Sequence, residues 1–182
     1  MSINTNELHK DLPLVVIVGP TASGKTSLAV EIAEDFNGEI ICADSRSIYK
    51  GANIGTAKPS QDDRSRAKHW GLDLAKPDEY FTVADFKKYA NEKIIEIRSR
   101  GKVPILVGGT GLYVDSVIFD FNFGPIANIE KRNELNNLTL ENLHEYCIKN
   151  NIPLPENDKN KRYVVRAIER FGQNLSRRDE PI

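Results

Sequence analysis

The chain has 182 residues, which is enough for one globular domain with at most a small appendage. Its formal net charge of −1 gives no overall basic field for nucleic acid, and its 40% hydrophobic and 28% charged content is typical of a water-soluble globular protein. The two cysteines, Cys42 and Cys147, lack the C-x-x-C spacing of a zinc site and favour a reducing, cytoplasmic location. The polar start lacks the apolar core of a signal peptide, and no apolar run is long enough to span a bilayer, so we expect no membrane association.

The strongest motif lies between two predicted elements near the start of the chain. An apolar run at 14–18 predicts a strand buried on both faces, and the apolar spacing over 26–36 predicts a helix. The residues between and at the start of the helix have the G-x-x-x-x-G-K-[ST] spacing of a phosphate-binding loop: Gly19, Pro20, Thr21, Ala22, Ser23, Gly24, Lys25 and Thr26. Such a loop binds phosphate through its backbone N–H groups and the helix N-terminus, while Lys25 reaches a terminal phosphate and the Thr26 hydroxyl ligates Mg²⁺.

A second strand is predicted at 39–43, and Asp44 follows directly after it. Strand, helix and strand within about thirty residues form a βαβ unit, in which ligands bind beyond the carboxyl ends of the strands. Asp44 and the phosphate loop should therefore face one crevice. The segment 50–76 is rich in glycine, proline and charge, and predicts a long loop with short helical pieces that covers the site. We interpret its Trp70 as a partly buried anchor, with base stacking as the alternative.

The same strand-to-turn-to-helix pattern then recurs. A capping box at Thr82 begins a helix that Gly101 ends. A third strand at 103–107 leads into Gly108-Gly-Thr-Gly111 and a further helix over 112–118. Two helix N-termini at one crevice suit a multiply charged anion.

The predicted fold is an α/β core of the P-loop NTPase kind, with a parallel sheet flanked by helices and a small helical appendage. Its expected parts are residues 1–122 as the core, 123–156 as a short helical insertion, and 157–182 as the core's last helix with a polar tail. Arg162, Arg166 and Arg170 fall at i, i+4 and i+8 of that helix. This stripe is either a solvated face or a contact with a phosphate backbone.

Six segments, in order and with the right spacing from about residue 12 to 176, resemble the motifs of the tRNA dimethylallyltransferase (tRNA isopentenyltransferase) family. They are 19–26, 39–45, 51–59, 80–86, 104–113, and 157–158 with 166–169. A generic kinase shares only the first of these.

The resemblance implies transfer of a dimethylallyl group from dimethylallyl diphosphate to N6 of the adenine adjacent to the anticodon in tRNA. The diphosphate is then the leaving group, held by the loop, by Lys25 and by Mg²⁺ on Thr26. Asp44 matches the general base of the family, and Thr110 the residue where adenine meets diphosphate. The tRNA-binding residues implied are Asp44, Ser45, Arg46, Ser47, Thr110, Arg162 and Arg166. We expect the protein to act as a monomer.

Two departures from the family concern the acceptor. Position 47 is serine where the family has a glutamine that reads the target base. Family members also continue beyond the equivalent of Ser176 with a diphosphate-clamping arginine and helices that grip tRNA, so this short form should have a more open site and weaker tRNA affinity. The alternatives are an adenylate isopentenyltransferase that uses free AMP, ADP or ATP, a small-molecule kinase, and a tRNA-binding paralogue without turnover.

Overall fold

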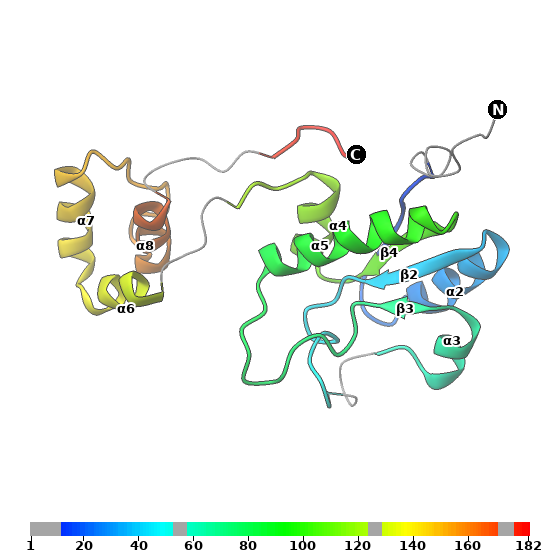
Figure 1. The fold of residues 1–182 in the computed structure, drawn as a ribbon. Coiled ribbons are helices and arrows are strands. Elements are labelled where there is room, and N and C mark those ends of the chain that lie inside the picture. The colour runs from blue at the N-terminus through cyan, green and yellow to red at the C-terminus, as the bar shows by residue number, and fades with distance from the viewer. Residues whose placement is uncertain (1–11, 53–57, 124–128, 171–176) are drawn as a thin grey trace. The chain divides into compact units, whose positions relative to one another are not determined.

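The computed structural model describes residues 12–52, 58–123, 129–170 and 177–182 (Figure 1). The chain forms two compact units, Met1–Asp120 with Asp179–Ile182 and Phe121–Arg178. Among the described residues, no helix combines the length and apolar character needed to cross a bilayer.

The first unit is built on a four-stranded, wholly parallel sheet. Its strands are β1 (Val15–Val18), β2 (Gly38–Cys42), β3 (His69–Trp70) and β4 (Val103–Gly108), in the order β1-β4-β2-β3. β4 is central, with Ile105 opposite Val15 of β1 and Ile40 of β2. The parallel α/β class that the sequence predicts is confirmed.

Helices cover both faces of this sheet (Figure 1). On one face α2 (Lys25–Asp35) buries Ala29, Val30 and Ala33 against β2 and β4, and α3 (Gln61–Arg66) lies beside it. On the other face lie α4 (Val83–Ser99) and α5 (Gly111–Ile118). The predicted capping box of α4 is present, with the Thr82 hydroxyl accepting from the Asp85 amide.

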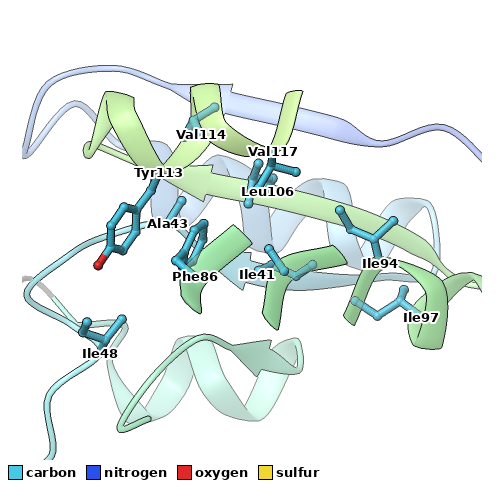
Figure 2. Packing of buried hydrophobic residues seen from close by; sticks show 11 residues of the cluster. Ile41, Ala43, Ile48, Phe86, Ile94, Ile97, Leu106, Tyr113, Val114 and Val117 are labelled. Carbon is cyan, nitrogen blue, oxygen red and sulfur yellow. The ribbon is translucent and has the colours of Figure 1, made fainter. Parts of the chain in front are cut away.

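The largest core cluster lies between the sheet and the α4–α5 pair (Figure 2). Phe86 of α4 is fully buried and stacks on Tyr113 of α5, with ring centroids 4.3 Å apart and an interplanar angle of 16°. Ile41 and Leu106 face this cluster from the sheet. The packing fixes α5, and therefore the turn that precedes it, against the strand ends.

One expectation about the N-terminal βα unit is wrong. β1 is not buried on both faces, because it lies at the sheet edge; Val16 is 37% exposed and Val18 62% exposed. α2 faces the core with its small residues, whereas Leu28 and Phe36 are exposed.

The segment predicted as a covering loop contains more regular structure than expected. Its described part includes α3 and β3, and β3 pairs with β2 through Ile40 opposite His69. Residues 53–57 lie outside the described residues. Trp70 donates its indole N–H to Glu39 at 2.7 Å, and the ammonium groups of Lys68 and Lys93 each lie 4.1 Å from the ring centroid. These contacts favour the anchor interpretation over base stacking.

The second unit consists of α6 (Ile129–Asn137), α7 (Leu140–Lys149) and α8 (Lys161–Glu169). Its core contains Leu143 and Cys147 of α7 and Val164, Val165 and Ile168 of α8. The sequence-based division placed 157–182 with the α/β core, and the structure differs: the apolar side of α8 packs on α6 and α7, so α8 belongs to the helical unit.

Candidate functional site

The phosphate loop connects β1 to α2 in a conformation that needs left-handed backbone. Gly24 is the N-cap of α2 with φ 83°, and Ala22 adopts φ 64°, which is uncommon for a residue with a Cβ. The first turn of α2 contains no acidic side chain, so its N–H groups and the positive end of its dipole remain available to an anion. The Lys25 ammonium donates to the Pro20 carbonyl and lies 3.5 Å from Ser23 Oγ, so it folds back over the loop.

Asp44 lies in a tight turn that begins where β2 ends. Its Oδ1 accepts from the amides of Arg46 (2.8 Å) and Ser47 (3.2 Å), and the Ser47 hydroxyl donates back to the Asp44 carbonyl at 3.1 Å. This is the local capping role that an aspartate after a strand often has. Within the described residues Oδ2 accepts no hydrogen bond, so one carboxylate oxygen is held and the other can accept from a ligand.

Thr110 connects the end of β4 to the Asp44 turn. It occupies the N-cap position of α5, yet its side chain makes no capping bond there. Instead Oγ1 accepts from the Ser45 amide at 3.0 Å, and the Thr110 amide donates to the Ala43 carbonyl at 3.3 Å. A Cβ on Gly108 would lie 2.0 Å from the Ala43 carbonyl oxygen, so only glycine allows β4 and β2 to approach this closely.

These elements line one cavity of about 180 Å³. Residues Thr21 to Thr26 of the loop, together with Asp44, Ser47 and Gly108–Gly109, form its polar part. Its apolar part consists of Ala29, Ile40, Cys42 and Val107, with Pro59 and His69 beside them. The expectation that Asp44 and the phosphate loop face one crevice is confirmed. Five other predicted site residues of the first unit are not among the lining residues: Gly19, Pro20, Ser45, Arg46 and Thr110.

His69 is a cavity residue that the sequence patterns did not single out. Its Nδ1 lies 2.8 Å from the Ala67 carbonyl, and since a carbonyl oxygen only accepts, Nδ1 carries the proton. Nε2 is therefore an acceptor, and it is buried without a partner among the described residues. Burial lowers the pKa of His69, which keeps the ring neutral. A single histidine in a predicted loop carries no periodic signal that could have identified it.

The neighbouring Cys42 is chemically quiet. Burial raises the pKa of its thiol to about 12, so it lines the cavity as a small apolar group and is no nucleophile at neutral pH.

The predicted arginines Arg162 and Arg166 lie on α8, in the helical unit, and both are exposed. Desolvation lowers the pKa of Arg166, and the positive charges of Arg162, Arg170 and Arg132 lower it further. Arg132 pairs with Glu169 through two bonds of 2.6 and 2.8 Å. The helical unit therefore presents a concentration of guanidinium charge that a phosphate would relieve.

The donor set fits a divalent metal that takes most of its ligands from phosphate and water. Among the described residues, no group of three or more His, Cys, Asp or Glu side chains could hold a metal. Mg²⁺ at phosphate sites needs no such group, since it keeps several waters and binds through one or two side chains plus substrate phosphates. The Thr26 hydroxyl lines the cavity and can supply one ligand.

Comparison with known proteins gives a consistent picture. The family model described as IPP transferase matches residues 47–179. The tRNA dimethylallyltransferase of Streptococcus agalactiae is 40% identical over 178 residues, covering 94% of this chain and 60% of that protein. The tRNA dimethylallyltransferase of Acetivibrio thermocellus is 51% identical over 134 residues, covering 73% and 43%.

Solved structures with similar folds carry related names. The chain resembles the tRNA isopentenylpyrophosphate transferase of Bacillus halodurans with a TM-score of 0.61 and 42% identity, over 87% of this chain and 55% of that one. It resembles a eukaryotic dimethylallyltransferase acting on tRNA with a TM-score of 0.68 and 26% identity, over 84% and 40%. The core thus has the P-loop NTPase-like fold of these proteins, and the chain spans about half the length of the relatives it matches.

Proposed function

The chain belongs to the IPP transferase family, and we propose that it transfers a dimethylallyl group from dimethylallyl diphosphate to N6 of the adenine adjacent to the anticodon in tRNA. One observation carries the proposal: the phosphate loop and the carboxylate of Asp44 line the same small cavity. A phosphate cradle alone suits many reactions. A cradle beside a carboxylate with one unbonded oxygen suits displacement of diphosphate by an amine that must lose a proton.

The loop's task is to hold the leaving group. In the transfer, the bond between the allylic carbon and the diphosphate oxygen breaks, and negative charge develops on that oxygen. The loop N–H groups, the N-terminus of α2 and the Lys25 ammonium stabilise this charge where it forms. For this Lys25 must leave Pro20 and Ser23 and turn to the phosphates. A Mg²⁺ bound through Thr26 would supply further positive charge beside the diphosphate.

Asp44 acts on the acceptor. The lone pair of an exocyclic amine is delocalised into the adenine ring, so the amine becomes a good nucleophile only as it loses a proton. Two backbone amides hold Oδ1, which leaves Oδ2 to accept that proton as the new N6–carbon bond forms. The adenine must leave its stack to reach the cavity.

The choice of acceptor rests on two opposing features. The arginines of α8 favour a polyanion such as the anticodon arm. Ser47 favours a free adenine nucleotide, because its side chain is buried and its hydroxyl is bonded within the Asp44 turn, so it cannot replace a base-reading glutamine. We propose that the reaction takes place in the cytoplasm, where nucleotides are available and cysteines stay reduced. We also propose that the monomer is the acting unit.

Labelled dimethylallyl diphosphate and Mg²⁺, incubated separately with unmodified tRNA, AMP and ATP, test the proposal. Label in tRNA supports it, label only in a nucleotide replaces the acceptor, and no transfer to any of the three refutes it. The Asp44→Asn variant should lose transfer while retaining diphosphate binding, and Asp78→Asn, an exposed residue outside the cavity, is the matched control. Transfer that survives in Asp44→Asn would exclude Asp44 as the base.

A further inference from the structure

Lys58 is a buried lysine that lies outside the cavity lining. Its side chain is only 3% exposed, and its ammonium donates to Asp73 Oδ1 and to the Tyr49 carbonyl, each at 2.8 Å. Lysine is almost never buried unless its charge is paired, because removing an ammonium from water is costly. The pair of Arg66 and Glu34 in the same unit differs in its cation, because the Arg66 side chain is 40% exposed, whereas the two acids, Asp73 at 39% and Glu34 at 41%, are equally accessible.

The Lys58–Asp73 pair connects to the Asp44 turn through a short series of bonds. The Asp73 amide donates to the Ser47 carbonyl at 3.3 Å, and the Ser47 amide donates in turn to Asp44 Oδ1 at 3.2 Å. Lys58 holds the chain two residues further on, by its bond to the Tyr49 carbonyl.

Two backbone bonds extend this connection. The Ala75 amide donates to the Ile48 carbonyl at 3.1 Å, and the Lys50 amide donates to the Ala75 carbonyl at 2.8 Å. Residues 47–50, the C-terminal part of the segment that carries Asp44, are therefore attached to residues 73–75. The Lys58–Asp73 pair, in which the lysine is buried and the aspartate is 39% exposed, lies at that junction.

Asp73 itself adopts a strained conformation. Its φ of 55° lies in the left-handed region, which aspartate tolerates better than most residues but still adopts at a cost. In this conformation its amide reaches Ser47 while its carboxylate reaches Lys58. Such strain persists only where surrounding contacts over-determine it, and it is frequent beside functional sites.

We propose that Lys58 and Asp73 are positioning residues, which orient the carboxylate of Asp44 by holding the C-terminal part of its turn at Ser47 and Tyr49. The inference rests on the function proposed above for Asp44. It concerns the catalytic step only, because neither residue is among those that line the cavity. Loss of the pair should misplace the base and leave the diphosphate site intact.

Three variants separate positioning from folding. Lys58→Met removes the ammonium at similar length, and Lys58→Met/Asp73→Asn removes both charges, so that no unpaired carboxylate is left at the junction. Arg66→Met breaks an exposed ion pair and is the control. We expect both Lys58 variants to bind inorganic diphosphate within about twofold of the wild type. Their kcat should fall by roughly 10- to 100-fold, the effect expected of a displacement of about 1 Å at a catalytic group.

Hydrogen exchange supplies a readout that needs no activity. The amides of Arg46 and Ser47, protected by Asp44, should exchange faster in both Lys58 variants and at the wild-type rate in Arg66→Met. Unchanged exchange over 44–50 overturns the proposal, whether or not the wild type is active. Absence of transfer by the wild type would refute only the proposed function. Wild-type kcat in the double variant would overturn the proposal. Loss of diphosphate binding in parallel with kcat would show a structural role instead.

Discussion

Gly24 provides a direct test of how the phosphate loop works, through the single substitution Gly24→Ala. A Cβ on Gly24 would meet no described atom within 4 Å, so the substitution creates no clash. What it changes is the backbone: φ is 83°, and alanine in the left-handed region costs about 1–2 kcal/mol. Alanine also has less freedom in the unfolded chain, which returns about 0.4–1 kcal/mol. The net cost is therefore about 1 kcal/mol.

This cost can appear in either of two measurements. If the variant keeps the native loop, the free energy of unfolding falls by about 1 kcal/mol. If the free loop relaxes to another conformation, diphosphate must restore the native one when it binds, and its dissociation constant rises about fivefold. The two losses should add up to about 1 kcal/mol. Urea unfolding, followed by the fluorescence of the single tryptophan Trp70, measures the loss of stability. Calorimetric titration with diphosphate measures the loss of affinity.

Gly51 supplies the control. It has φ 76° and likewise no described atom within 4 Å of an added Cβ, so Gly51→Ala should cost as much stability without affecting the loop. The reasoning is refuted if Gly24→Ala leaves both quantities unchanged. It is also refuted if Gly51→Ala weakens diphosphate binding to the same extent.

Three further substitutions test other parts of the core. Thr110→Val deprives the half-buried Ser45 amide of its acceptor and should lower the free energy of unfolding by about 1 kcal/mol, measured in urea. Burial alone would raise the pKa of Glu39, but hydrogen bonds from Trp70, Lys102 and Arg100 outweigh it and lower the pKa below 4.5. The stability that these bonds contribute is present above pH 4.5 and is lost as the pH falls through the pKa of the folded state. Glu39→Gln should therefore remove that part of the acid unfolding transition. Burial lowers the pKa of His69 below 6.5, so the free energy of unfolding declines as the pH falls from 6.5 toward the pKa of the folded state. In His69→Gln the melting temperature should change less with pH over that range.

The elements that the sequence predicted well are those whose signals are local. The phosphate loop is bounded by an apolar run and a helical pattern, and Thr82 and Asp85 three residues apart define the start of α4 by themselves. The crevice followed from topology, because turns after parallel strands meet at one edge of the sheet.

The misjudged elements depend on partners distant in the sequence. An apolar run cannot reveal whether its strand is central or at an edge, so β1 was expected to be more buried than it is. β3 has two residues, too few for any period, and exists because β2 offers it an edge. The apolar stripe of α8 fits a sheet or a helix equally well, and only packing assigns it to α7.

The same limit applies within the site. Lys58 and Asp73 are fifteen residues apart in a stretch where charged residues are common, and nothing local distinguishes this pair from solvated charges. From the sequence, Ser47 is notable only as the replacement of a family glutamine, whereas in the structure it forms two hydrogen bonds with Asp44. Contacts of this kind appear only after the chain has folded.

The strand order gives the turn after β4 a specific place in the proposed reaction. β4 lies between β1 and β2, so this turn separates the phosphate loop from the Asp44 turn. A Cβ on Gly109 would lie 3.7 Å from the Gly19 carbonyl oxygen, and one on Gly108 would collide with Ala43, so the turn touches both neighbours. In the proposed reaction a diphosphate on the loop and an amine at Asp44 would lie on opposite sides of this turn. Gly108 allows β4 to approach β2, and Gly109 leaves the side of the turn near Gly19 without a side chain, so the two glycines keep the donor and acceptor sites close together.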